Sequence, residues 1–95
     1  MKLPLRFDMT TTRADFRRLL PAAVNHVPFV EEGEAFAHNE GGRGWRIGIE
    51  PLPHLRLGTI RLERHRLNFD FSGYSAGEIE DFMARFEMYF RRGGG

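Results

Sequence analysis

The four histidines are the residues of this chain best suited to acid–base or metal chemistry, because imidazole titrates near neutral pH and ligates metals. They are His26, His38, His54 and His65. No two of them have the H-x-x-x-H spacing that brings two ligands to one face of a helix. Each is expected near a turn or a strand end. We therefore predict no metal site.

Catalysis would need one of these histidines beside a carboxylate or a nucleophile, such as His65 with Asp70 or with Ser72. No G-x-S-x-G elbow surrounds Ser72. The chain has no cysteine, which excludes a thiol nucleophile and a Cys-based zinc site. We predict no catalytic residue and no cofactor. A small enzyme using His65 or His54, with a pocket between helix and sheet, is the third functional hypothesis.

The run Gly41-Gly42-Arg43-Gly44 has the glycine content of a phosphate-binding loop. It lacks the lysine and the Ser/Thr of a P-loop, and it precedes an expected strand instead of a helix. We interpret it as a hairpin turn.

Charge is unevenly distributed although the formal net charge is only +1. Residues 31–40 carry four glutamates and no basic residue except a histidine, whereas residues 43–66 carry six arginines and two glutamates. A net charge near zero argues against strong attraction to phosphate in general. Opposed patches of charge indicate self-association as readily as they indicate an anionic ligand.

The length of 95 residues predicts one domain, which we place at residues 1–92, followed by a flexible glycine tail at 93–95. The tail resembles that of ubiquitin-like and sulfur-carrier proteins, but it follows an expected helix, where glycine is an ordinary stop signal. Proline and arginine interrupt the N-terminus before any apolar signal segment forms, and no later stretch is long and apolar enough to span a membrane. We expect a soluble, cytoplasmic protein without a membrane partner.

Hydrophobic periodicity predicts the element order β-α-β-β-β-β-α. The expected helices are one capped within Thr10-Thr11-Thr12 and broken or bent at Pro21, and one at 76–92 with a capping box of Ser75 and Glu78. A loop is expected at 51–53, a bulge at Gly58 and a turn at 65–66. The expected strands are 3–9, 27–31 with a possible continuation to 38, 43–50, 55–64 and 67–71.

Two prolines help to order these strands, because proline cannot donate to a sheet ladder and belongs at an edge. Pro4 and Pro28 both fall on edges if the strands form an antiparallel sheet of order 2-3-4-5-1. Both helices then cover one face of an α+β domain. This element order, over the whole chain, resembles the TATA-binding-protein-like and helix-grip folds; the resemblance implies a fold and no function.

The sheet face without helices is expected to be polar, with nearly balanced charges and no aromatic residue for stacking bases. We therefore expect a non-catalytic module that binds itself, as a homodimer, or another protein. The alternative is a binder of nucleic acid or another anion, using Arg46, Arg56, Arg61, Arg64 and Arg66. The residues expected to bind a partner are Arg46, Arg61, Glu63, Arg66, Asp70 and, on the exposed side of the last helix, Met88.

Overall fold

The computed structural model describes residues 5–93, with side chains described up to Phe90. It confirms the α+β class and the predicted order of elements. These elements are β1 (Arg6–Met9), α1 (Arg13–Ala23), β2 (Val30–Glu32), β3 (Ala35–Glu40), β4 (Arg43–Leu57), β5 (Ile60–Ser72) and α2 (Ala76–Gly93). Gly93, which we assigned to the glycine tail, is the last residue of α2. Gly94 and Gly95 lie outside the described residues.

The strands form one antiparallel sheet in the order β1-β5-β4-β3-β2, which is the predicted order. The two edge strands are short, as is common where unpaired edges must not attract other chains. Pro28 lies just before the edge strand β2, and Pro4 lies outside the described residues. Placing the prolines at the edges therefore gave the correct strand order.

Strands β4 and β5 are much longer than predicted. The expected loop at 51–53 and the expected turn at 65–66 are wrong, because both segments are strand. Pro51 and Pro53 are tolerated because β3 pairs with β4 only as far as Gly48, so the far side of β4 has no ladder to break there. The bulge lies between Leu52 and Leu55, whereas Gly58 belongs to the hairpin turn, with a φ of +63°.

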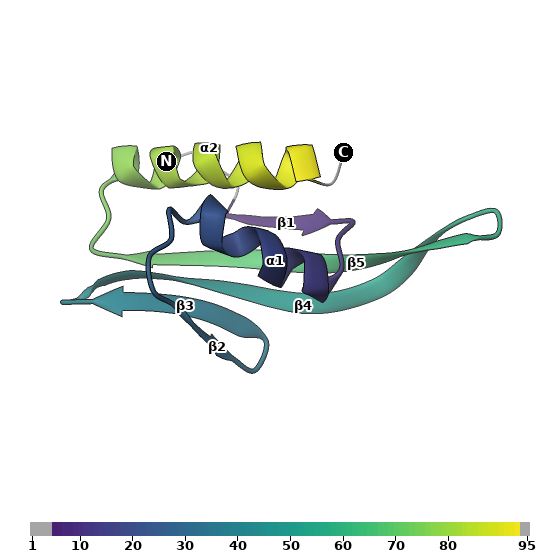
Figure 1. Cartoon of the computed structure of the whole chain (residues 1–95), viewed down its shortest axis with the longest axis horizontal. Helices are drawn as coiled ribbons and strands as arrows, with labels where there is room; N and C mark the ends of the chain where they lie inside the picture. Colours follow the sequence, from purple (N-terminus) through teal and green to yellow (C-terminus); the bar gives the residue numbers. More distant parts are fainter. Residues whose placement is uncertain (1–4, 94–95) are drawn as a thin grey trace.

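The far end of this hairpin, residues 52–64, is hereafter the arm. Beyond Leu52 and Arg64 its two strands pair only with each other. Figure 1 shows the arm extending past both helices and past the rest of the sheet. A two-stranded ribbon is at best marginally stable in water by itself, so the arm is expected to be the least stable part of the sheet.

The other hairpins follow from glycine conformation. The segment predicted as one strand from residue 27 is split into β2 and β3 by a turn at Gly33, whose φ is +60°. Gly41 and Gly42, at φ +60° and +80°, form the two-residue connection between β3 and β4. Two successive positive φ values are the signature of a type I′ turn, which confirms the hairpin interpretation of this glycine run.

Both helices begin at the predicted caps. The side chain of Thr12 accepts a hydrogen bond from the backbone N–H of Asp15 at 3.0 Å. Ser75 and Glu78 form the reciprocal capping box, at 2.9 and 3.2 Å. Helix α1 continues through Pro21 to Ala23, so the helix is not broken at that proline; the bend that was predicted as the alternative stays a prediction.

The two helices share one aromatic core against one sheet face. Phe16 of α1 lies 5.2 Å from Phe36 of β3 between ring centroids, and Phe86 of α2 lies 4.9 Å from Phe69 of β5. Phe16 also contacts Phe90 of α2, at 5.1 Å. In Figure 1 the two helices lie beside each other along the sheet. Because side chains alternate along a strand, the intervening residues of β4 and β5 face away from both helices.

The edge strand β2 is attached to α1 by a carboxylate between two arginines. Glu31 accepts from Arg13 at 2.9 Å and from Arg17 at 2.8 Å, and Arg13 also donates to the carbonyl of Gly33. Hydrogen bonds from Arg17 first, and then from Arg13, lower the pKa of Glu31 from 4.5 to about 2. The ionised form of Glu31 is thus favoured by folding.

This pair gives a pH-dependent prediction. The pKa of Glu31 is depressed in the folded chain, so its contribution to stability is complete above about pH 4.5 and is lost as the pH falls towards about 2. Glu31→Gln should lower the urea midpoint at pH 7, and its difference from wild type should vanish near pH 2. Glu34→Gln, on an exposed turn residue without an ion pair in the described chain, is the control. Equal midpoints for wild type and Glu31→Gln at pH 7 would contradict the prediction.

Candidate interaction surface

The sheet face that carries no helix, hereafter the free face, is the candidate site. Its members alternate with the buried residues of each strand. On the three central strands these are Ala35, Ala37 and Asn39 of β3, Gly44, Arg46, Gly48, Glu50 and Leu52 of β4, and Arg64, Arg66, Asn68, Asp70 and Ser72 of β5. Arg6 and Asp8 of β1, and Val30 and Glu32 of β2, complete it at the edges.

The part of the free face near β1 is occupied by ion pairs within the chain. Asp8 accepts from Arg66 at 2.9 Å and lies 3.6 Å from Arg64. The hydrogen bond from Arg66 is the main reason that the pKa of Asp8 is lowered. The amide of Asn68 donates to Glu50 at 3.5 Å. The Asp8 carboxylate is thus already bound by two arginines of its own chain.

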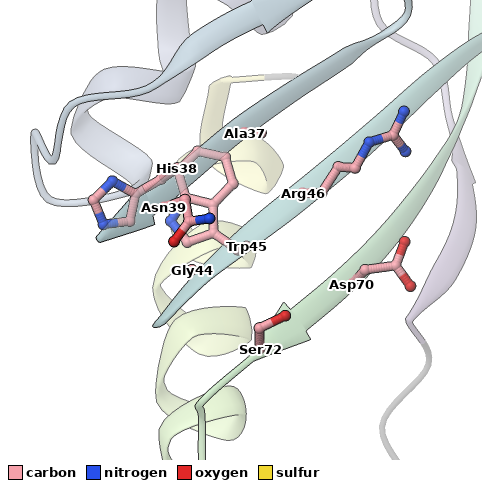
Figure 2. A pocket seen from close by; sticks show the side chains of 8 residues that line it. All are labelled: Ala37, His38, Asn39, Gly44, Trp45, Arg46, Asp70 and Ser72. Carbon is pink, nitrogen blue, oxygen red and sulfur yellow. The ribbon is translucent and has the colours of Figure 1, made fainter. Parts of the chain in front are cut away.

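At the opposite end, the free face is hollowed into a depression of about 290 Å³ (Figure 2). It is lined by Ala37, His38, Asn39, Gly44, Trp45, Arg46, Asp70 and Ser72. The surface is lower here because Ala37 and Gly44 have almost no side chain. A Cβ atom on Gly44 would lie 2.0 Å from the carbonyl oxygen of His38, so close backbone approach requires glycine at this position.

Two opposite charges beside this depression have no partner within the described chain. Arg46 and Asp70 are directly opposite each other in the β4–β5 register. The side chain of neither takes part in an ion pair or hydrogen bond among the described residues 5–90. Figure 2 shows both side chains beside the depression, on adjacent strands. They are therefore available to charges on another molecule.

The arm has one apolar and one basic side. Leu55 lies opposite Leu62, and Leu57 opposite Ile60, on the side of β5 that continues the free face. Leu57 and Ile60 are 56% and 57% exposed, among the most exposed large apolar residues of the described chain. On the other side, Arg56 lies opposite Arg61.

The structure brings together only some of the residues predicted to bind a partner. Arg46, Arg66 and Asp70 share the free face. Arg61 and Glu63 do not: β5 runs without a break from Ile60 to Ser72, and their parity is that of His65 and Leu67. We assigned them to the free face because they alternate with the apolar Ile60 and Leu62, which were expected to face the helices. Met88 is 47% exposed on α2, away from the free face.

His65 is a structural residue, contrary to the expectation of a turn or strand end. It lies within β5, is 7% exposed, and its Nδ1 is 2.7 Å from the carbonyl oxygen of Thr11. Asp70 and Ser72 have the opposite parity and lie on the other face of the sheet, so neither pairing considered for His65 forms. Among the described residues no group of three or more His, Asp or Glu side chains converges as a metal site would require.

The apolar side of the arm was missed by the sequence analysis, although its pattern is visible. Leu55 and Leu57 precede Gly58-Thr59, and Ile60 and Leu62 follow it. Apolar alternation on both sides of a two-residue glycine turn is typical of a hairpin.

Comparison with protein-family models, with curated proteins and with solved structures finds no match in any of the three. No helix in the described part of the chain is long and apolar enough to cross a membrane. Function is therefore argued from the geometry of the free face.

Proposed function

We propose that this protein is a non-catalytic self-association module, which forms a homodimer through the β4 and β5 part of its free face. The observation that supports this most is the cross-strand register of these two strands. The two-fold axis of this homodimer runs parallel to the strands, between the two facing sheets. It lies directly above the line midway between β4 and β5. Such an axis brings each residue of β4 over the residue of the second copy that pairs with it in the β4–β5 register.

Every pair that this axis would create between charged residues is complementary. Arg46 meets Asp70 of the second copy, and Glu50 meets Arg66. On the arm, Leu57 meets Ile60 and Leu55 meets Leu62. The register therefore gives a self-complementary surface from the depression to the tip of the arm.

The apolar contacts supply the driving force and the charges supply the specificity. Burial of apolar surface contributes about 25 cal/mol per Å², and the arm exposes several leucine and isoleucine side chains. Exposed ion pairs contribute about 0–1 kcal/mol each, but like charges that face each other suppress wrong arrangements. A net charge of +1 leaves little long-range repulsion between two copies.

Molar mass measured by light scattering tests this proposal. From about 1 µM to about 1 mM chain, the mass should rise from 11.0 kDa towards twice that value. The double variant Leu57→Thr, Ile60→Thr keeps residues that favour strands and removes the apolar contact. It should require at least about tenfold more protein to reach the same mass, a loss of about 1.4 kcal/mol or more.

Met88→Gln is the matched control, because it removes an exposed apolar side chain from α2 instead of from the arm. Its mass curve should coincide with that of wild type. Wild type that stays at 11.0 kDa throughout, or an association weakened by Met88→Gln and not by the arm variant, would refute the proposed interface.

A further inference from the structure

The basic side of the arm is not used by the proposed homodimer. Arg56 and Arg61 lie directly opposite each other across the β4–β5 ribbon, near its tip. Both are exposed, and the side chain of neither forms an ion pair or hydrogen bond with the side chains and backbone described for residues 5–90. The nearest carboxylate along β5 on this side is Glu63, two residues closer to the body of the sheet. The tip therefore carries two unneutralised guanidinium groups.

This arrangement opposes the stability of the hairpin. Like charges directly opposite each other on neighbouring strands repel and destabilise the pairing. The ribbon has no third strand or helix at this point to compensate. An unfavourable cross-strand pair that no nearby contact compensates is typical of a functional position.

We infer that Arg56 and Arg61 bind the phosphate groups of a nucleic-acid duplex. Guanidinium groups bind phosphate oxygens with charge-assisted, often bidentate hydrogen bonds. The tip projects and is not part of the depression on the free face, so it suits a large rigid polyanion better than a small enclosed anion. A duplex carries about one negative charge per 1.7 Å along its axis, which supplies phosphates to both arginines at once.

A nucleic acid is favoured over an anionic membrane because the apolar side of the arm is not available to a bilayer. An element that lies on a bilayer inserts its apolar side and keeps its basic groups on the opposite side. The proposed homodimer, on which this step rests, instead buries the apolar side of the arm between two copies. Here Leu57 and Ile60 are on one side, and Arg56 and Arg61 are on the other. Asparagine and glutamine, which read adenine edges, are absent from residues 52–64. The contact that we infer is with phosphates, which carry no base-sequence information.

Fluorescence anisotropy of a short labelled DNA duplex tests this inference. The full chain should bind, and its affinity should fall between about 50 mM and about 200 mM salt. Arg56→Gln, Arg61→Gln should weaken binding at the lower salt by roughly tenfold or more, and should make the slope of log affinity against log salt less steep by about 1.8 for each bound chain. This variant should unfold at no lower temperature than wild type, because the repulsion across the ribbon is removed.

Arg17→Gln, Arg18→Gln is the control, since it removes two exposed arginines from α1 while Arg13 still binds Glu31. It should leave DNA binding within about twofold of wild type. No binding at about 50 mM salt, equal losses in the two variants, or binding to phosphatidylserine vesicles in place of DNA would each overturn the inference. Light scattering separates it from self-association: the mass curve of Arg56→Gln, Arg61→Gln should match that of wild type.

Discussion

Replacing Phe86 by alanine is expected to lower the free energy of unfolding by about 3–5 kcal/mol. Phe86 is 1% exposed and lies where both helices and the sheet meet. Its ring centroid is 4.2 Å from that of Phe90, 4.9 Å from Phe69 and 6.2 Å from Phe16. Truncation leaves a cavity lined by rigid rings, which cannot collapse to fill it. Since whole domains are stable by about 5–15 kcal/mol, this one change removes a large share of the total.

Urea unfolding followed by circular dichroism measures this loss. Met88→Ala, two residues further along α2 on an exposed position, is the control and should change the free energy of unfolding by no more than about 0.5 kcal/mol. A loss below about 1 kcal/mol for Phe86→Ala would mean that α2 does not pack on the sheet through this ring.

The fold was largely predictable because its determinants are local. Ser75 with Glu78 and Thr12 with Asp15 specify where the helices begin, and the aromatic spacing of α2 specifies its buried side. Placing Pro4 and Pro28 at the two edges of a meander gave the strand order that the sheet has. The helix caps and the aromatic spacing involve residues that are close in sequence, so they can be recognised from the sequence alone.

The lengths of β4 and β5 were not predictable from the same patterns. Pro51 and Pro53 favour a loop by local rules, and they are tolerated only because β3 ends before them. That fact depends on the length of a different strand. The side of Arg61 and Glu63 was wrong for a different reason: the apolar Ile60 and Leu62, which alternate with them, were expected to face the helices, whereas they lie on the side of the free face.

The candidate site was predictable in type but not in detail. Balanced charge in alternating positions indicated a polar free face, and Arg46, Arg66 and Asp70 lie there. Which of these charges already have partners depends on distances between strands. Arg66 is bound to Asp8 at 2.9 Å, whereas Arg46 and Asp70 have no ion-pair partner in the described chain. The depression depends on close backbone approach at Gly44, which leaves no mark in the sequence.

Reversing one charge of the proposed interface is expected to abolish self-association. In the two-fold arrangement, Arg46→Asp sets a carboxylate against Asp70 of the second copy, and symmetry creates this contact twice. Asp70→Arg sets two guanidinium groups together in the same way. Like charges juxtaposed in an interface cost several kcal/mol, so each variant should dissociate at least about a hundredfold more readily than wild type. Light scattering on each purified variant measures the effect.

Neither variant alone separates an interface from a change within one chain, because Arg46 and Asp70 are also neighbours across β4 and β5. Mixing the two variants makes that separation. An Arg46→Asp chain and an Asp70→Arg chain offer each other only opposite charges at both contacts, although each repels its own copy.

Light scattering of the equimolar mixture is therefore decisive. Each variant alone should stay at 11.0 kDa, and the mixture should reach twice that mass at concentrations where wild type does. A mixture that stays at 11.0 kDa where wild type associates, or single variants that associate as wild type does, would show that the free face is not the surface through which two copies meet.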